Sequence, residues 1–146
     1  MPYVEAETVV KADPQRVYEV VKNTADYPEF MPAVDKITIE SSEPGRQVSV
    51  WEAKLKGAAM KWREEDIAYD DELRIHYDLL SGDLKVFRGD WTCETHPEGT
   101  LLKVTCEFEI GIPMFAAMLN PVAKLVVKEN CESMLAGIKE HAEKLG

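Results

Sequence analysis

Residues 120–145 read NPVAKLVVKENCESMLAGIKEHAEKL, the one stretch of the chain in which apolar residues keep a sustained period of 3.6. This period predicts a long amphipathic helix whose apolar stripe contains Ala123, Val126, Val127, Met134 and Ile138. An extended segment, a short helix and a long run of strands come before it. A long helix that follows a meander of antiparallel strands can bury its stripe across the concave face of the sheet. Such a sheet tends to leave a cavity beneath the helix, which suggests a container for a hydrophobic molecule.

The length and composition indicate one globular domain covering residues 1–146. A chain of 146 residues can form one substantial core but not two. Apolar residues make up 45% and charged residues 30%, which is ordinary for a soluble protein. The chain has no run of about 18 apolar residues, so we expect no integral membrane segment.

Charge and cysteine content narrow the possible partners and the compartment. The net charge of −10 opposes nucleic-acid binding, because such binding needs a basic face. Three cysteines without CxxC spacing predict neither a disulfide framework nor a zinc site. The N-terminal segment MPYVEAETVVKADP lacks the features of a secretory signal. We therefore expect a cytoplasmic protein with no metal and no cofactor.

The rest of the chain reads as one strand, a short helix and then a meander. Residues 3–11 are expected to form a strand, and Asp13-Pro14 predicts the start of a helix after it. The two prolines in 23–32 allow only a short helical turn in that segment. A short connector helix is expected within 110–119. The pattern predicts an α+β fold with an antiparallel sheet of six or seven strands, at residues 33–41, 46–56, 60–69, 73–80, 84–96 and 100–110.

Alternation within two strands predicts which side chains face the interior. In the last strand, Leu102, Val104, Cys106 and Phe108 share one face. In the strand from Met60, an inward Trp62 would bring Glu64 and Asp66 with it. A carboxyl group in an apolar pocket can have a raised pKa and act as a general acid or base, although such residues also lie at solvated rims.

Asn130 interrupts the apolar stripe of the last helix, between Val127 and Met134. A buried amide needs hydrogen-bond partners. Either the core or water satisfies it, or it orients an oxygen atom of a ligand. The histidines are scattered, and none has a second metal ligand at a suitable spacing.

The chain resembles the START-like superfamily, and within it the polyketide cyclase/dehydrase group, which includes coenzyme Q-binding START-like proteins. The resemblance lies in ADPQRVYEVVKNTADYPEFMPAVDKI at 12–37, in Gly89-x-Trp91 with Glu98-Gly99-Thr100, and in the helix at 120–145. It implies a helix-grip fold, in which a curved antiparallel sheet wraps a long C-terminal helix and two short helices follow the first strand.

The resemblance also implies a set of pocket residues. Positions that line the pocket in the aromatase/cyclase branch correspond here to Tyr27, Met31, Val34, Met60, Trp62, Leu84, Phe87, Trp91, Cys106 and Asn130. Further expected ligand-binding residues are Tyr77, Phe108, Leu119 and Met134. Two pocket arginines of that branch correspond to Asp66 and Asp78, so an anion replaces a cation that would stabilise an enolate. A register slip of one residue could instead bring Arg63, Arg74 or Arg88 inward.

Three functions stay open on the sequence. The leading hypothesis is binding or carriage of a hydrophobic small molecule, such as a lipid, an isoprenoid quinone or an aromatic polyketide-like compound. The second is a polyketide cyclase or aromatase-dehydratase in which Glu64, Asp66 or His76 serves as acid or base. The third is a protein-interaction module, with a possible homodimer built on the outer face or an edge strand of the sheet.

Overall fold

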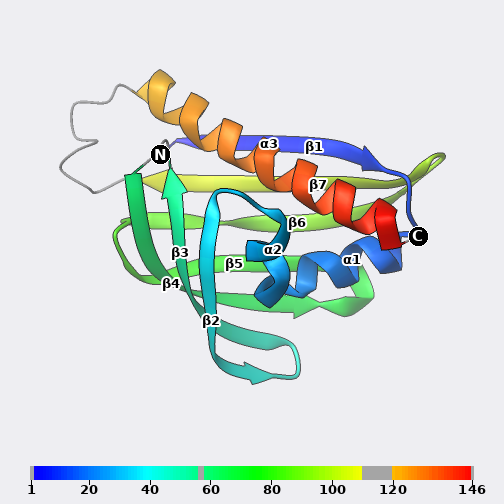
Figure 1. The fold of residues 1–146 in the computed structure, drawn as a ribbon, viewed down its shortest axis with the longest axis horizontal. Helices are drawn as coiled ribbons and strands as arrows, with labels where there is room; N and C mark the ends of the chain where they lie inside the picture. Colours follow the sequence, from blue (N-terminus) through cyan, green and yellow to red (C-terminus); the bar gives the residue numbers. More distant parts are fainter. Residues whose placement is uncertain (1, 56–57, 110–119, 146) are drawn as a thin grey trace.

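The computed structural model describes residues 2–55, 58–109 and 120–145, which form one curved sheet with helices on one side of it (Figure 1). The strands are β1 (Tyr3–Val10), β2 (Val34–Glu43), β3 (Arg46–Leu55), β4 (Ala58–Tyr69), β5 (Arg74–Gly82), β6 (Val86–His96) and β7 (Gly99–Glu109). The helices are α1 (Pro14–Lys22), α2 (Tyr27–Phe30) and α3 (Asn120–Leu145), with short 3-10 helices η1 (Thr24–Asp26) and η2 (Asp70–Glu72).

The sheet is an antiparallel meander with the order β1-β7-β6-β5-β4-β3-β2. From β2 to β7, each strand pairs with the next one in the chain, and β1 closes the order by pairing with β7. β1 thus becomes an edge strand beside the last strand (Figure 1). The predicted α+β helix-grip architecture is confirmed.

The two short helices after β1 close one end of the sheet. The carboxylate of Asp13 accepts a hydrogen bond from the amide of Gln15 at 3.2 Å, and Pro14 occupies the first turn of α1, as the sequence predicts. Tyr27 begins α2 and is 1% exposed, so this short helix is anchored in the core. Its hydroxyl donates to the carbonyl of Val21 at 2.5 Å, which joins α2 to the end of α1.

Helix α3 lies nearest to β1 and less close to the middle of the sheet (Figure 1). Side chains, rather than backbone contact, therefore fill the space between α3 and the central strands. Gly137 allows α3 to approach α2, because a Cβ atom there would lie 2.9 Å from the carbonyl oxygen of Phe30. The buried residues of α3 are Ala123, Val126, Val127, Cys131, Leu135, Ile138 and Ala142.

Most of the predicted stripe is buried, whereas Met134 is only half-buried against the core. The connector helix expected within 110–119 lies outside the described residues. None of the described helices combines the length and apolar character needed to cross a membrane.

Candidate functional site

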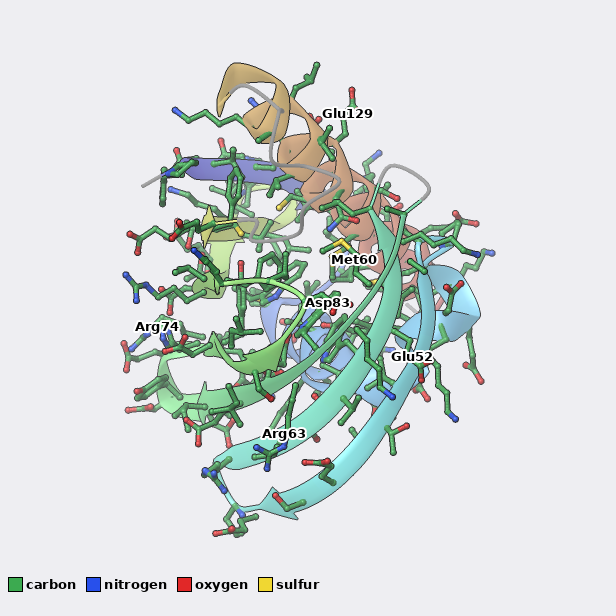
Figure 2. All side chains as sticks on the ribbon, turned by 90° about the vertical axis from the view of Figure 1, so that its left-hand side faces the viewer. Glu52, Met60, Arg63, Arg74, Asp83 and Glu129 are labelled. Atoms are coloured by element: carbon green, nitrogen blue, oxygen red, sulfur yellow. The ribbon has the colours of Figure 1, made fainter. Side chains whose placement is uncertain are left out.

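The inner face of β4 contributes a row of four residues to the space beneath α3. Met60, Trp62, Glu64 and Asp66 are buried at 3%, 8%, 4% and 9% exposure. The intervening Lys61 and Arg63 are exposed. Figure 2 shows Met60 between the sheet and α3, and Arg63 on the outer side. The alternation read from the sequence thus places both carboxyl groups inside the fold.

Two neighbouring cavities lie in this space. The first has a volume of about 40 Å³. The second has about 30 Å³. Ala53, Trp62, Phe87 and Asn130 line both cavities. The first cavity is lined by Val21, Thr24, Tyr27, Val34, Trp51, Ala53, Trp62, Glu64, Asp66, Ile75, Tyr77, Phe87, Trp91, Val104, Asn130, Cys131 and Met134.

Aromatic rings from five elements pack against each other around the first cavity. Trp51 and Trp62 are directly opposite in the β3–β4 register and stack at 5.6 Å between centroids, with 15° between their planes. Tyr27 meets Trp51 edge-on at 5.7 Å, and Phe87 meets Trp62 at 5.5 Å. Phe87 also contacts Tyr77 at 5.4 Å. This connected row gives the cavity a largely apolar, aromatic wall.

The buried Glu64 and Asp66, here called the carboxyl pair, bring acidic chemistry into this wall. The indole Nε1 of Trp62 donates to Glu64 Oε1 at 2.9 Å. Burial, followed by the neighbouring Asp66, raises the pKa of Glu64 well above its usual value. Burial also raises the pKa of Asp66, whereas its hydrogen bond with Glu64 lowers it. Both pKa values are thus raised, that of Glu64 the more strongly, and the two carboxyl groups titrate as a pair.

One oxygen of the carboxyl pair lacks a partner. Asp66 Oδ1 is buried, and no donor in the described part of the chain reaches it. A buried acceptor without a hydrogen bond costs about 1–3 kcal/mol. Asp66 also borders a hollow on the protein surface, together with Lys22 and Arg46. Both of those cations are engaged with other acids, Lys22 with Asp70 at 2.9 Å and Arg46 with Glu65 at 2.6 Å.

Asn130 supplies a polar group from the helix side of the cavities. Its side-chain nitrogen has a weak contact with Met134 Sδ at 3.8 Å, from one turn further along α3. The amide thus lines both cavities without a strong hydrogen bond to its donor nitrogen in the described structure. A molecule in either cavity would therefore lie next to this amide.

Tyr77 lines the first cavity and packs against Gly89. The Tyr77 hydroxyl donates to the carbonyl of Thr105 at 2.6 Å, between β6 and β7. A Cβ atom on Gly89 would overlap that same carbonyl and lie 2.8 Å from the Tyr77 hydroxyl. The structure therefore explains the glycine at position 89 of the Gly89-x-Trp91 motif. A side chain there would prevent the Tyr77 hydroxyl from reaching the carbonyl of Thr105.

Most of the expected ligand-binding residues gather around the two cavities. The first cavity is lined by Tyr27, Val34, Trp62, Tyr77, Phe87, Trp91, Asn130 and Met134. Met60, Leu84 and Phe108 line the second. Met31 and Cys106 are buried in the core but line neither cavity. Leu119 lies outside the described residues.

The structure does not place His76 with Glu64 and Asp66. Its Nδ1 lies 3.2 Å from Asp90 Oδ1, which also accepts from Arg74 Nη1 at 2.8 Å, on the outer face of the sheet. Asp78 lies two residues along β5 on that same face, opposite Arg88 in the ladder. Buried Tyr77 lies between them in sequence and faces inward. The alternation of β5 therefore corrects the placement of His76 and Asp78 near the pocket.

The three arginines that a register slip could have turned inward also lie outside. Arg63 pairs with Glu40, Arg74 with Asp90 and Arg88 with Glu107. Arg63 and Arg74 project from the outer side in Figure 2. Within the described residues, the first cavity has no lysine or arginine in its lining, while Lys54 borders the second. A cation able to stabilise an enolate in the first cavity is thus missing from this lining.

Several lining residues were not among those expected from the sequence. Trp51 is the largest of them, and period-2 alternation from Ala53 and Ser49 would have indicated its inward direction. Thr24 enters from η1 and is held by Gln47, whose Nε2 donates to its Oγ1 at 2.7 Å. No local pattern points to Thr24, because its position depends on a contact between distant parts of the chain.

The cysteines and the possible metal ligands suggest no further chemistry here. Cys93, Cys106 and Cys131 are free and buried. Burial raises the pKa of Cys131, which lines the first cavity, to about 12. A thiol with such a pKa is a poor nucleophile near neutral pH. Across residues 2–55, 58–109 and 120–145, no three histidine, cysteine or carboxylate side chains gather in a way that could hold a metal ion.

The family model described as polyketide cyclase / dehydrase and lipid transport matches residues 10–135, and the chain belongs to this family. The crystal structure of TTHA0849 from Thermus thermophilus is similar, with 30% sequence identity, 99% of each chain covered and a TM-score of 0.93. The resemblance stated from the sequence is thereby confirmed. A search of the curated proteins found no match to the chain.

Two other solved structures share the fold at lower identity. The Zhui aromatase/cyclase from a Streptomyces species is 21% identical, with 97% of this chain and 93% of that chain covered and a TM-score of 0.86. A START superfamily protein from Mycobacterium smegmatis is 20% identical, with 99% of each chain covered and a TM-score of 0.86. These two similarities support the fold alone. What the site can do chemically has to be argued from its own residues.

Proposed function

We propose that this protein binds a hydrophobic small molecule between the sheet and α3 and holds or carries it. The observation that carries the proposal is the connected aromatic wall formed by Tyr27, Trp51, Trp62, Tyr77 and Phe87 along the first cavity. Burying apolar ligand area against such a wall contributes about 25 cal/mol per Å². Family membership supports the same function, since the family description includes lipid transport.

Ligand entry requires side chains to move. The two cavities hold only about 40 and 30 Å³, too little for a molecule with several rings or a long chain. Trp62 and Phe87 line both of them, so rotation of these rings joins the two spaces. Phe87 is half-buried and thus less confined than Trp62. We expect the ligand to replace the ring contacts that now fill the space.

The first test is native mass spectrometry of gently purified protein, followed by organic extraction. A discrete lipid, quinone or aromatic compound released from the protein is the expected result. An empty protein that also shows no rise in melting temperature with a panel of such compounds would contradict the proposal.

A pair of variants separates cavity binding from surface adsorption. Ala53 is buried and lines both cavities, so Ala53→Leu should fill the space and weaken ligand binding at least about tenfold. Ala59 is exposed on the neighbouring strand, and Ala59→Leu is the matched control. Equal loss of binding in both variants would indicate that the compound does not occupy the cavities.

The carboxyl pair favours a second candidate, a polyketide cyclase or aromatase-dehydratase. Burial raises the pKa of Glu64 in an apolar setting, which favours its use as a general acid in the dehydration of a carbonyl compound. The absence of lysine and arginine from the described lining of the first cavity weighs against enolate stabilisation there. Turnover of a model poly-β-ketone that is lost in Glu64→Gln would support this candidate, and turnover that survives in the Glu64→Gln Asp66→Asn protein would eliminate it.

We also propose a cytoplasmic location without nucleic-acid partners. Three buried free thiols suit a reducing compartment. The net charge of −10 would repel nucleic acid. Fractionation and a nucleic-acid binding assay at low salt would test the two statements.

A further inference from the structure

Asp66 is the one residue of the site with a polar atom that is buried and unpartnered. The residue is 9% exposed, lines the first cavity, and its Oδ1 has no hydrogen-bond partner in the described structure. A native core rarely keeps such an atom unless water or a ligand reaches it. The aromatic wall explains how a ligand is held, but it leaves this oxygen unexplained.

The state of the carboxyl pair determines what the free oxygen can do. Trp62 donates to Glu64, so the indole N–H is already used and does not reach Asp66 Oδ1. Asp66 lines the first cavity and no donor in the described structure reaches its Oδ1, so this oxygen stays available as an acceptor. A complementary partner must supply a hydrogen rather than another lone pair.

No cation in the described structure neutralises this oxygen. Lys22 and Arg46 border the outer hollow beside Asp66, but they pair with Asp70 and Glu65. His76 lies on the opposite face of the sheet, with Asp90. From there His76 still lowers the pKa of Asp66 through space, but it contacts Asp90 and not Asp66, and Tyr27 and Glu65, which also act on the carboxyl pair, add no positive charge.

The two polar features of the site lie toward different ends of the first cavity. Asp66 also borders the outer hollow, whereas Asn130 also borders the second cavity. The aromatic rings line the same cavity. A ligand that fills the first cavity can therefore meet the carboxyl pair with one end and the amide with the other.

We propose, building on the binding function above, that the ligand is an aromatic or otherwise apolar molecule that donates a hydrogen bond from a hydroxyl or ammonium group to Asp66 Oδ1. The same site then discriminates against carboxylates, including fatty-acid anions, because a second anion would meet an acceptor without a nearby cation. Hydroxyl and ammonium groups share the chemistry that the site requires, and a variant of Asp66 distinguishes between them.

Four probes with the same ring system test the inference on the wild-type protein by titration calorimetry at pH 7. They are 2-naphthol, 2-naphthylmethylammonium, 2-methoxynaphthalene and 2-naphthoate. Hydrogen bonds to charged groups are strong enough that each donor should bind about tenfold or more tightly than 2-methoxynaphthalene. 2-Naphthoate should bind most weakly.

Variants then assign the preference to Asp66. Asp66→Asn keeps a carbonyl acceptor but removes the charge, so 2-naphthol should bind nearly as before and the ammonium probe about tenfold more weakly. Asp66→Leu should abolish the preference for donors altogether. Asp78→Asn changes an outward-facing carboxylate on the adjacent strand and should alter neither probe.

The outcomes separate this inference from the proposed function. Equal affinity for all four probes, or tightest binding of 2-naphthoate, overturns the inference while leaving hydrophobic binding intact. If the preference for donor probes persists in Asp66→Leu, Asp66 is not the acceptor that binds them. Failure of every probe to bind, combined with an empty extract from purified protein, overturns both.

Discussion

The two faces of β4 carry charge in opposite ways. On the outer face, Arg63 pairs with Glu40 at 2.5 Å and Glu65 pairs with Arg46 at 2.6 Å. On the inner face, Glu64 and Asp66 lie among aromatic rings, and the described lining of the first cavity has no basic residue.

The difference between the two faces of β4 indicates where a ligand could interact with charged groups. Outer-face charges satisfy each other in water, where such pairs contribute at most about 1 kcal/mol. Inner-face charge is costly, and it persists beside a cavity in which a ligand or water can reach it. The proposed function therefore depends on the inner face of β4, whereas the outer face carries ion pairs in contact with water.

Replacing Trp62 by alanine should produce the largest effect on stability. Trp62 is 8% exposed, stacks on Trp51 and donates to Glu64. Removing a buried ring of this size costs about 3–5 kcal/mol. Urea unfolding measures the loss, and Trp62→Phe, which keeps a ring without the indole donor, should cost clearly less. Similar losses in both variants would assign the main role of Trp62 to its hydrogen bond.

Gly89→Ala should be the next most damaging change. The added Cβ would overlap the carbonyl of Thr105 and crowd the Tyr77 hydroxyl, so we expect a loss of about 3 kcal/mol. Gly45→Ala is a useful control, because its Cβ would meet nothing closer than 3.8 Å and only its φ of +80° is unfavourable. The control should lose about 1 kcal/mol. If Gly45→Ala were the more damaging, the packing argument for Gly89 would be wrong.

The inner face of β4 could be predicted from the sequence because its information is local. Alternation around Trp62 predicts that Glu64 and Asp66 face inward, and burial confirms this direction. In the same way, Asp13-Pro14 predicts the start of α1 within one residue. The apolar period of residues 120–145 likewise predicts α3.

Other features depend on pairings that the sequence does not reveal. The β4–β5 ladder runs without a break from Tyr69 paired with Arg74 to Glu64 paired with Leu79, and it shifts only farther from the turn, between Arg63 and Glu64. Tyr77 faces inward because it pairs with Asp66 in this ladder, and that pairing, which places His76 and Asp78 outside, had to come from the structure. Cys106 shows a second limit of prediction from the sequence. It is buried as expected but lines neither cavity, because the sequence predicts burial and not where a cavity lies.

The carboxyl pair should make stability depend on pH. Burial raises the pKa of Glu64 above its unfolded value, so the folded protein binds more protons than the unfolded chain. Its contribution is fully present below the unfolded pKa of about 4.3 and is lost as pH rises through the folded pKa. The free energy of unfolding should therefore decline as pH is raised above about 5.

The Glu64→Gln Asp66→Asn protein separates this effect from other titrations. Tyr27, Glu65 and His76 also act on the carboxyl pair, but they remain in the double variant. Urea unfolding from pH 5 to pH 8 should show a flatter profile for the double variant than for wild type. An unchanged slope would mean that the carboxyl pair does not control the decline.

Arg63→Ala should have the smallest effect, although Arg63 lies next to Trp62 in the chain. Its guanidinium pairs with Glu40 where both side chains are more than a third exposed, at 46% and 40%. Water and ions screen such a pair, so the loss should stay below about 1 kcal/mol and shrink further in 1 M salt. Ligand binding should not change, because Arg63 is outside both cavities. A loss close to that of Trp62→Ala would contradict the division between the two faces, since it would show that the outer charges hold the sheet together as strongly as the aromatic wall does.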